Sequence, residues 1–407
     1  MLKKISVDQL RLGMHIRELC GPWMSHPFWR TKFVLTDPED IRRIRNSSIK
    51  EVWINTDKGL DVDEGEGETR EQVAAQVKKI LEKTLDREEQ PKQVTFDEEV
   101  KQAAKTCAKA TDAVRSMFAE LRMGKALSAG AVNGLVEEIS SSLYRNPGAL
   151  LSLARLKTAD DYTYMHSVAV SALMVSLARQ MGFNDEEVHE AGRAGLLHDV
   201  GKANIPMKVL NKPGKLTDEE FAIVKIHPEE GHRILLEAKS TSEVPLDVVL
   251  HHHEKMDGSG YPHRLVGLEI SRFARMGAVC DVYDAITSNR PYKQGWDPTE
   301  SIQKMTEWTG GHFDPEIFQA FVKCIGIYPT GSLVSLTSGR VGVVLDQSAK
   351  SLLTPQVKVF FSTRTKTYLK PEVVDLSRHG CLEKIVGVED AAKWGIKNVS
   401  KYWAAPG

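Results

Sequence analysis

The sequence predicts a multi-domain protein in which a mainly α-helical bundle follows a small α+β domain and precedes a small β-rich appendage. A chain of 407 residues is longer than one ordinary hydrophobic core requires. Through the middle of the chain, apolar residues recur at helical spacing between clear helix start and stop signals. At both ends, short alternating segments separated by turn residues are typical of strands.

Residues 1–62 are predicted to form the small α+β domain, with an accessory or sensory role. Asp37 is a candidate N-cap, and Pro38 suits the first position of the helix that follows. An aromatic-rich run between residues 22 and 30 fits the core of a small domain better than a ligand or partner patch. Strands are predicted over Lys4–Val7, His15–Leu19 and Glu51–Asn55.

Residues 63–130 are predicted to be linker helices. The segment begins acidic and Gly-containing, and Pro91 interrupts its helical pattern. From Phe96 to Arg122 an apolar stripe recurs at helical spacing. Such a stripe packs into its own core more often than against a second copy, so a homodimer is the weaker of two expectations.

Residues 131–328 are predicted to form the helical bundle. A capping box at Thr217 starts one of its helices, and Pro228 breaks the pattern at His227. Other helices are predicted over Val132–Leu143, Gly148–Leu156, Tyr164–Met181, Asp185–His198, Val244–Leu250 and Ile270–Ser288.

Residues 329–407 are predicted to form a β-rich appendage, in which we find no candidate catalytic or binding residues. A helix is predicted to close it over Val388–Trp403. Its strands are predicted over Ser332–Leu336, Arg340–Leu345, Val357–Phe361 and Thr367–Leu369.

Composition excludes several classes of function. A net charge of −1 creates no overall positive field that would attract DNA or anionic lipid. The five scattered Cys form no C-x-x-C and are typical of reduced thiols. No apolar run approaches the roughly 20 residues of a membrane helix. We therefore expect a cytoplasmic protein that binds neither DNA nor membrane.

The strongest functional signal is a cluster of His and Asp in the bundle. Most of the thirteen His lie between residues 166 and 263. Imidazoles and carboxylates from different helices can hold Fe, Mn or similar ions, and an Asp can bridge two of them. Two such ions promote in-line phosphoryl displacement. A bundle with titrating surface histidines is the competing interpretation, which the interleaved Asp residues disfavour. The candidate ligands are His198, Asp199, His227, His252, His253 and Asp281.

Residues from about 131 to 328 resemble an HD-GYP domain, the helical metal-dependent phosphodiesterase family that degrades the bacterial second messenger cyclic di-GMP. Residues before 61 resemble an uncharacterised small domain often fused in front of it. The matching segments are His198-Asp199-Val200-Gly201-Lys202, His227-Pro228, His252-His253-Glu254, Asp257-Gly258-Ser259-Gly260-Tyr261-Pro262, Asp281-Val282-Tyr283-Asp284-Ala285 and Arg290-Pro291-Tyr292-Lys293.

The resemblance implies two divalent metal ions, with Fe or Mn favoured over Ni, Co, Zn or Mg. His166 matches a ligand of a third metal in some members, which carry Glu where this chain has Tyr162. A phenol is a poor substitute for a carboxylate, so two metals are favoured. Asp284 is expected to orient a ligand. One metal is implied on His198, Asp199 and Asp281, with Asp199 bridging, and the second on His227, His252 and His253.

The resemblance also implies hydrolysis of cyclic di-GMP to pGpG, and leaves a second cleavage to GMP open. Asp199 and Lys202 are the expected catalytic residues, with Lys202 serving the leaving oxygen. The phosphate- or substrate-binding residues implied are Lys202, Arg290, Lys293 and Tyr261. The Gly260-Tyr261-Pro262 loop is either a protein contact or a rigid turn at the rim of the groove.

Two rival functions remain open. One is an HD-type phosphohydrolase that acts on other nucleotides, which Lys202, Arg290 and Lys293 argue against. The other is a cyclic di-GMP-binding or partner-recruiting signalling protein with little turnover, which the intact ligand set argues against.

Overall fold

The computed structural model of the protein contains two compact units. One consists of Met1–Lys83 with Thr306–Trp308, and the other of Thr84–Met305 with Thr309–Gly407. The structure describes residues 1–20, 32–47, 49–62, 67–69, 72–73, 75–76, 94–155, 162–210, 212, 214, 216–238, 242–288, 295–348 and 351–403.

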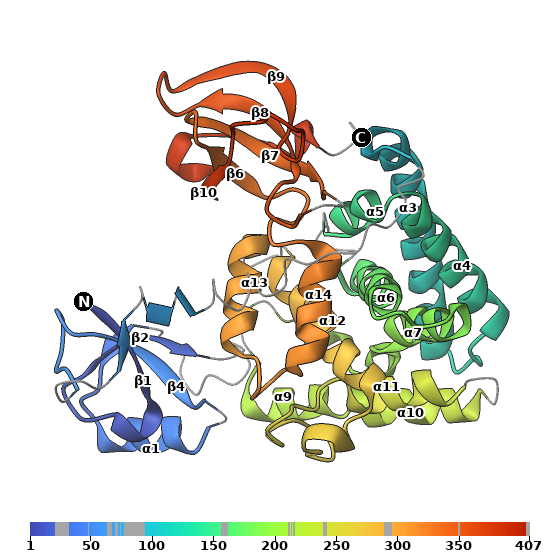
Figure 1. Cartoon of the computed structure of the whole chain (residues 1–407). Coiled ribbons are helices and arrows are strands. Elements are labelled where there is room, and N and C mark those ends of the chain that lie inside the picture. The colour runs from blue at the N-terminus through green and yellow to red at the C-terminus, as the bar shows by residue number, and fades with distance from the viewer. Residues whose placement is uncertain are drawn as a thin grey trace. The chain divides into compact units, whose positions relative to one another are not determined.

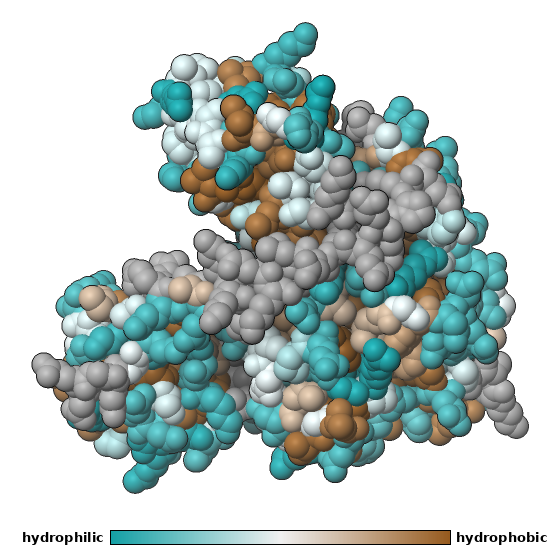
Figure 2. Space-filling view, viewed as in Figure 1, coloured by the Kyte–Doolittle hydropathy of each residue, from teal (hydrophilic) through white to brown (hydrophobic). Residues whose placement is uncertain are grey.

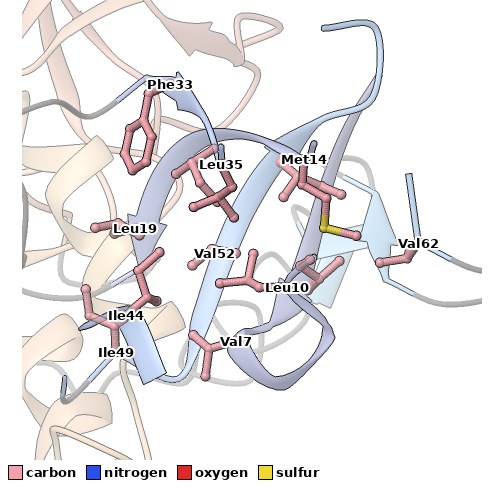
Figure 3. Packing of buried hydrophobic residues seen from close by; sticks show 13 residues of the cluster. Val7, Leu10, Met14, Leu19, Phe33, Leu35, Ile44, Ile49, Val52 and Val62 are labelled. Carbon is pink, nitrogen blue, oxygen red and sulfur yellow. The ribbon is translucent and has the colours of Figure 1, made fainter. Parts of the chain in front are cut away.

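The N-terminal unit is built on a five-stranded antiparallel sheet with the order β3-β2-β4-β1-β5. Asp37 caps the helix over Pro38–Arg45 through the backbone N–H of Glu39 at 2.8 Å, and Pro38 occupies its first turn, as predicted. Apolar side chains from the strands, the helix and the connecting loops gather into one core (Figure 3). Its elements are β1 (Leu2–Ser6), η1 (Val7–Gln9), β2 (His15–Cys20), β3 (Phe33–Val34), α1 (Pro38–Arg45), β4 (Glu51–Asn55) and β5 (Glu68–Thr69).

The second unit is mainly helical, with α6 at the centre of the bundle (Figure 1). Apolar side chains of α6 are fully buried along most of its length, because α3, α7 and α12 pack around it. The helices are α3 (Phe96–Arg122), α4 (Ala129–Arg145), α5 (Pro147–Ala154), α6 (Tyr162–Gln180), α7 (Asp185–Leu197), η3 (Val200–Asn204), α8 (Met207–Leu210), α9 (Asp218–Lys225), α10 (His227–Glu237), α11 (Glu243–His251), η4 (Gly267–Glu269), α12 (Arg272–Thr287), α13 (Pro298–Glu307) and α14 (Pro315–Ile325).

Capping signals determine where the helices that carry His begin and end. Asn184 forms a capping box with Glu187 at the start of α7, and Thr217 forms one with Glu220 at the start of α9. The break predicted near Pro228 occurs at Ile226, so His227 becomes the first residue of α10. Proline is tolerated there because N–H groups in the first helical turn need no intrahelical acceptor.

The C-terminal part forms a second five-stranded antiparallel sheet, with the order β10-β6-β7-β8-β9. Several apolar side chains on it are exposed, among them Leu382 and Val386, and hydrophobic residues are visible on this region in Figure 2. The strands are β6 (Leu333–Leu336), β7 (Arg340–Asp346), β8 (Gln356–Ser362), β9 (Thr367–Asp375) and β10 (Ile385–Val388).

The predicted closing helix over Val388–Trp403 is wrong. Val388 ends strand β10, and in residues 389–403 the structure describes two short 3-10 turns, η5 (Ala392–Trp394) and η6 (Val399–Tyr402), in place of a helix. Gly395 and Asn398 adopt positive φ values of 64° and 53°, which interrupt a right-handed helix. The predicted fold class is nevertheless confirmed: a helical bundle with an α+β unit before it and a β region after it.

Part of the predicted linker, residues 77–93, lies outside the described residues, whereas α3 has the bounds predicted for it. Among the helices of the described residues, none combines the length and the apolar character needed to cross a bilayer.

Candidate metal centre

Seven side chains predicted as metal ligands converge in the bundle, although they come from three helices and from the turns that follow two others. His166 lies near the start of α6, and His198 and Asp199 follow the last residue of α7. His227 begins α10, and Asp281 lies in the middle of α12. His252 and His253 come directly after α11. Apart from His253, these residues are all at most 8% exposed.

Asp199 lies between two groups of imidazoles. Its Oδ2 is 3.3 Å from His198 Nε2 and 3.5 Å from His166 Nε2. Its Oδ1 is 3.3 Å from His227 Nε2 and 4.0 Å from His252 Nε2. The two carboxylate oxygens thus face different groups, which is the arrangement that a bridging ligand requires.

Backbone carbonyls fix the orientation of three of these imidazoles. The Nδ1 atoms of His198, His227 and His252 lie 2.8, 2.8 and 3.0 Å from the carbonyl oxygens of residues 195, 224 and 248. A carbonyl only accepts hydrogen bonds, so each Nδ1 carries the proton and each Nε2 presents a lone pair. His227 Nε2 and His252 Nε2 are 3.4 Å apart, so their lone pairs face one another across a gap that a cation can fill.

The donor set fits divalent cations. Asp199 Oδ1 is buried and has no hydrogen-bond partner among the described residues. Burial opposes ionisation of this carboxyl, but the positive charge of the neighbouring Lys202 holds its pKa well below the usual range. Two sets of three side chains are suitable for a metal ion, because within each set the donor atoms lie within 4.8 Å of one another. One set is His227, His252 and His253, and the other is His166, His198 and Asp199. Imidazole with carboxylate suits Fe, Mn and Zn.

The His166 side chain lies next to those of His198 and Asp199. Its Nε2 is 3.2 Å from His198 Nε2 and 3.0 Å from Asp281 Oδ1, while its Nδ1 is 2.6 Å from Asp284 Oδ2. Burial lowers the pKa of His166, but the hydrogen bonds to Asp281 and Asp284 outweigh it and raise that pKa. The structure therefore places His166 as a partner of the first ligand group, oriented by a carboxylate on its other nitrogen. The side chain of Tyr162 lies outside the described residues.

Asp281 links both groups of ligands. Its Oδ1 is 3.9 Å from His198 Nε2, and its Oδ2 is 3.8 Å from His253 Nδ1. Burial disfavours the charge on Asp281, but the hydrogen bond from His166 and the nearby imidazoles hold its pKa well below the usual range. It therefore faces the centre as a second carboxylate.

Comparison with known proteins agrees with this architecture. Residues 142–317 match a family model described as an HD domain, and residues 2–132 match one described as a domain of unknown function (DUF3391). A Pseudomonas aeruginosa protein named as a cyclic di-GMP phosphodiesterase is 54% identical over 404 residues, which are 99% of this chain and 96% of that protein. The chain belongs to the HD-GYP family.

Two further relatives match only the HD-GYP part. A Xanthomonas campestris cyclic di-GMP phosphodiesterase response regulator, RpfG, is 39% identical over 42% of this chain and 47% of its own length. A Vibrio cholerae protein named 3′3′-cGAMP-specific phosphodiesterase 2 is 37% identical over 40% of this chain and 31% of its own length. The match spans less than half of each of these two relatives.

The other HD-GYP residues predicted for catalysis and substrate binding are only partly described. Lys202, on η3, places its Nζ 2.5 Å from Asp199 Oδ2. The Tyr261 ring stacks on His253, with centroids 4.7 Å apart, and burial raises the pKa of its phenol well above the usual value. Arg290 and Lys293 lie outside the described residues.

Sequence reasoning missed the role of Glu254, although it is part of the HD-GYP signature. Glu254 is 1% exposed and accepts the backbone N–H groups of three consecutive residues, 263 to 265, at 2.6, 3.0 and 3.1 Å. This carboxylate therefore anchors the loop that carries Tyr261. The only signal in the sequence was an acidic residue directly after two candidate ligands.

Protonation of the buried imidazoles should make the metal-free protein sensitive to acid. Burial lowers the pKa of His227 to about 3 and that of His252 to about 4, whereas an unfolded His titrates near 6.5. The unfolded state therefore binds more protons between these values, and stability is lost as pH falls. The raised pKa of His166 opposes this trend in part.

We expect the free energy of unfolding of EDTA-treated protein to drop by roughly 4 kcal/mol between about pH 6.5 and pH 4.5, about 2 kcal/mol from each of His227 and His252. Urea unfolding across this range measures the drop. A His252→Gln variant should show a shallower dependence, and equal slopes for the two proteins would contradict the assignment of neutral, buried imidazoles.

Proposed function

We propose that this protein is a metal-dependent phosphodiesterase that hydrolyses cyclic di-GMP to pGpG, with GMP as the product of a second cleavage. The observation that carries the proposal is the buried set of inward-facing Nε2 atoms around Asp199, whose Oδ1 lacks a hydrogen-bond partner among the described residues. The 54% identity to a cyclic di-GMP phosphodiesterase over nearly the whole chain supports the choice of substrate.

In this proposal, His198, Asp199, Asp281 and His166 would hold one metal ion, and His227, His252 and His253 would hold a second. Asp199 lies close to both sets of ligands. When bound, two divalent ions activate water and offset the charge that develops on the phosphoryl oxygens. Iron and manganese are the proposed ions, because the donor set combines imidazole nitrogen with carboxylate oxygen.

The protein's own groups orient and complete the site. Carbonyl oxygens and the Asp284 carboxylate hold the Nδ1 atoms, so the imidazoles do not rotate away when phosphate enters. Lys202 is held beside Asp199, where its ammonium can donate a proton to the leaving 3′ oxygen. Arg290 and Lys293 are proposed to hold the non-bridging phosphate oxygens.

A product assay tests the proposal directly. Full-length protein, purified anaerobically and loaded with Fe²⁺ or Mn²⁺, is incubated separately with cyclic di-GMP, 3′3′-cGAMP and GTP, and products are separated by chromatography. Preferred conversion of cyclic di-GMP to pGpG is expected. Tight binding without product would favour a receptor, and preferred hydrolysis of cGAMP or GTP would overturn the choice of substrate.

Replacing Lys202 tests its part in the reaction. We expect Lys202→Met to lower kcat about 100-fold, because proton donation by a positioned side chain typically contributes that much or more. Metal content, measured by mass spectrometry, should stay unchanged, which separates this role from metal binding. Lys208→Met, on the neighbouring α8, is the matched control. A full kcat in Lys202→Met would exclude the proposed role.

A further inference from the structure

A second pair of imidazoles lies outside the candidate metal centre. His251 is the last residue of α11, and His263 lies in the loop that carries Tyr261. Their ring centroids are 5.2 Å apart, and His251 Nε2 is 3.0 Å from His263 Nδ1. Neither residue belongs to the two ligand sets of the centre. The proposed reaction therefore leaves this close contact between ring nitrogens without a role.

A carboxylate one helical turn earlier fixes the tautomer of His251. Asp247 Oδ1 is 2.7 Å from His251 Nδ1, and the other oxygen of Asp247 accepts a hydrogen bond from Ser271 Oγ. An ionised carboxylate only accepts hydrogen bonds, so Nδ1 carries the proton and Nε2 presents its lone pair toward His263. A carboxylate on the far nitrogen is the arrangement that orients imidazoles that bind metal ions.

The spacing of the two nitrogens suits a shared ion. Nitrogens that bind one ion at about 2.0–2.1 Å lie roughly 2.9–3.4 Å apart in octahedral or tetrahedral geometry. The 3.0 Å between His251 Nε2 and His263 Nδ1 lies in this range. So does the 3.4 Å between His227 Nε2 and His252 Nε2 at the candidate metal centre. In the metal-free protein the proton on His263 Nδ1 bridges the pair, and its transfer to the other ring nitrogen frees a second lone pair for an ion.

A third imidazole and access to solvent support the same role. Burial lowers the pKa of His232, on α10, and the neighbouring His251 and His263 lower it further, although Asp247 opposes this. A neutral imidazole near the pair is available as a further ligand. The His251 side chain is 14% exposed and His263 is exposed, so an ion can enter from solution.

We propose that His251 Nε2 and His263 Nδ1 form a separate surface site for Zn²⁺, with water or His232 in the remaining positions. Imidazole nitrogen suits zinc, whereas manganese favours oxygen ligands and binds such sites more weakly. The pair offers no carboxylate oxygen directly to the ion, because Asp247 is held on the far side of the His251 ring. Zinc and manganese should therefore distinguish this site from the carboxylate-containing centre.

An ion at this site would tie the Tyr261 loop to the end of α11. The backbone N–H of His263 donates to the buried Glu254 carboxylate at 2.6 Å, so its position in the loop is already fixed from one side. His251 directly precedes the candidate ligand His252. Zinc would add a second link between the loop and this helix, and bound zinc should slow the opening of the loop. A consequence for catalysis rests on the proposed function, whereas zinc binding itself does not.

Metal analysis of the full-length protein tests the site. The wild type and its variants are dialysed against micromolar Zn²⁺ or, separately, Mn²⁺, and metal per chain is measured by mass spectrometry. We expect His251→Gln and His263→Gln to bind one zinc ion fewer than the wild type. His379→Gln, which changes an exposed histidine of the C-terminal region, should match the wild type. Asp247→Ala should weaken this zinc ion about 10–100-fold, as expected for a carboxylate that orients a ligand. Manganese content should be equal in all of them.

Further variants separate ligation from a structural effect. Unchanged zinc content in both Gln variants overturns the site. His263→Cys should regain the lost ion, because a thiolate binds zinc, and failure to regain it excludes direct ligation. If His251→Gln also loses manganese, its effect is on the adjacent His252, and the two His263 variants decide.

Hydrogen exchange tests the link between the loop and α11. Adding Zn²⁺ to manganese-loaded protein should slow exchange of the backbone N–H groups of residues 263–265 in the wild type but not in His263→Gln. Equal exchange with and without zinc would reject the link while leaving the metal analysis to decide the site. None of these measurements depends on turnover.

Discussion

Asp199→Ala is expected to abolish turnover of cyclic di-GMP while leaving the fold near intact. Asp199 approaches both groups of imidazoles closely, because its Oδ2 lies 3.3 Å from His198 Nε2 and its Oδ1 lies 3.3 Å from His227 Nε2. In the proposed centre, its loss would remove a ligand from each metal at once. Metal ions supply several kcal/mol of transition-state stabilisation, so we expect kcat to fall at least about 10³-fold. Product chromatography and metal analysis of the anaerobically loaded variant measure both effects.

The fold should tolerate this change because Asp199 is costly to bury. Its Oδ1 has no hydrogen-bond partner among the described residues, and removing the carboxylate relieves that cost. Asp112→Asn, on the exposed face of α3, is the matched control and should keep both metal and activity. Full turnover by Asp199→Ala under metal-replete conditions would overturn the assignment of the centre.

Five of the candidate ligands could be predicted from the sequence because they lie where a helix starts or stops: His198, Asp199, His227, His252 and His253. Pro228 stops one helix and permits the next, and this break leaves His227 pointing inward at the start of α10. A capping box at Asn184 sets the start of α7, and His198 and Asp199 directly follow the last residue of this helix. Local signals of this kind act within a few residues and can be read without a structure.

Contacts between distant segments could not be predicted in this way. Asp284 and His166 are 118 residues apart, and nothing in either local pattern indicates that they bond. The same limit explains the error at the C-terminus. Apolar spacing around Val388 suits a helix, but pairing with β6 draws this segment into the sheet. Strand pairing depends on a partner far away in the sequence, so it overrides local preference.

The loop that carries Tyr261 gives the second large expected effect. Its backbone approaches Glu254 so closely that a Cβ added at Gly260 would lie 2.5 Å from the Glu254 Cα. The buried Glu254 carboxylate accepts three consecutive backbone N–H groups, so one side chain holds three successive residues of the loop. Removing it breaks three hydrogen bonds to a charged acceptor at once.

We therefore expect Glu254→Ala to lower the free energy of unfolding by about 3–5 kcal/mol and to reduce turnover at least tenfold, because Tyr261 loses its position over His253. Urea unfolding and a product assay measure the two losses. Glu269→Ala, in the same region, removes an exposed carboxylate that accepts only one backbone N–H, and it should cost less than about 1 kcal/mol. If both variants were equally stable, the anchoring role of Glu254 would be refuted, because burial and the number of donors are what distinguish the two glutamates.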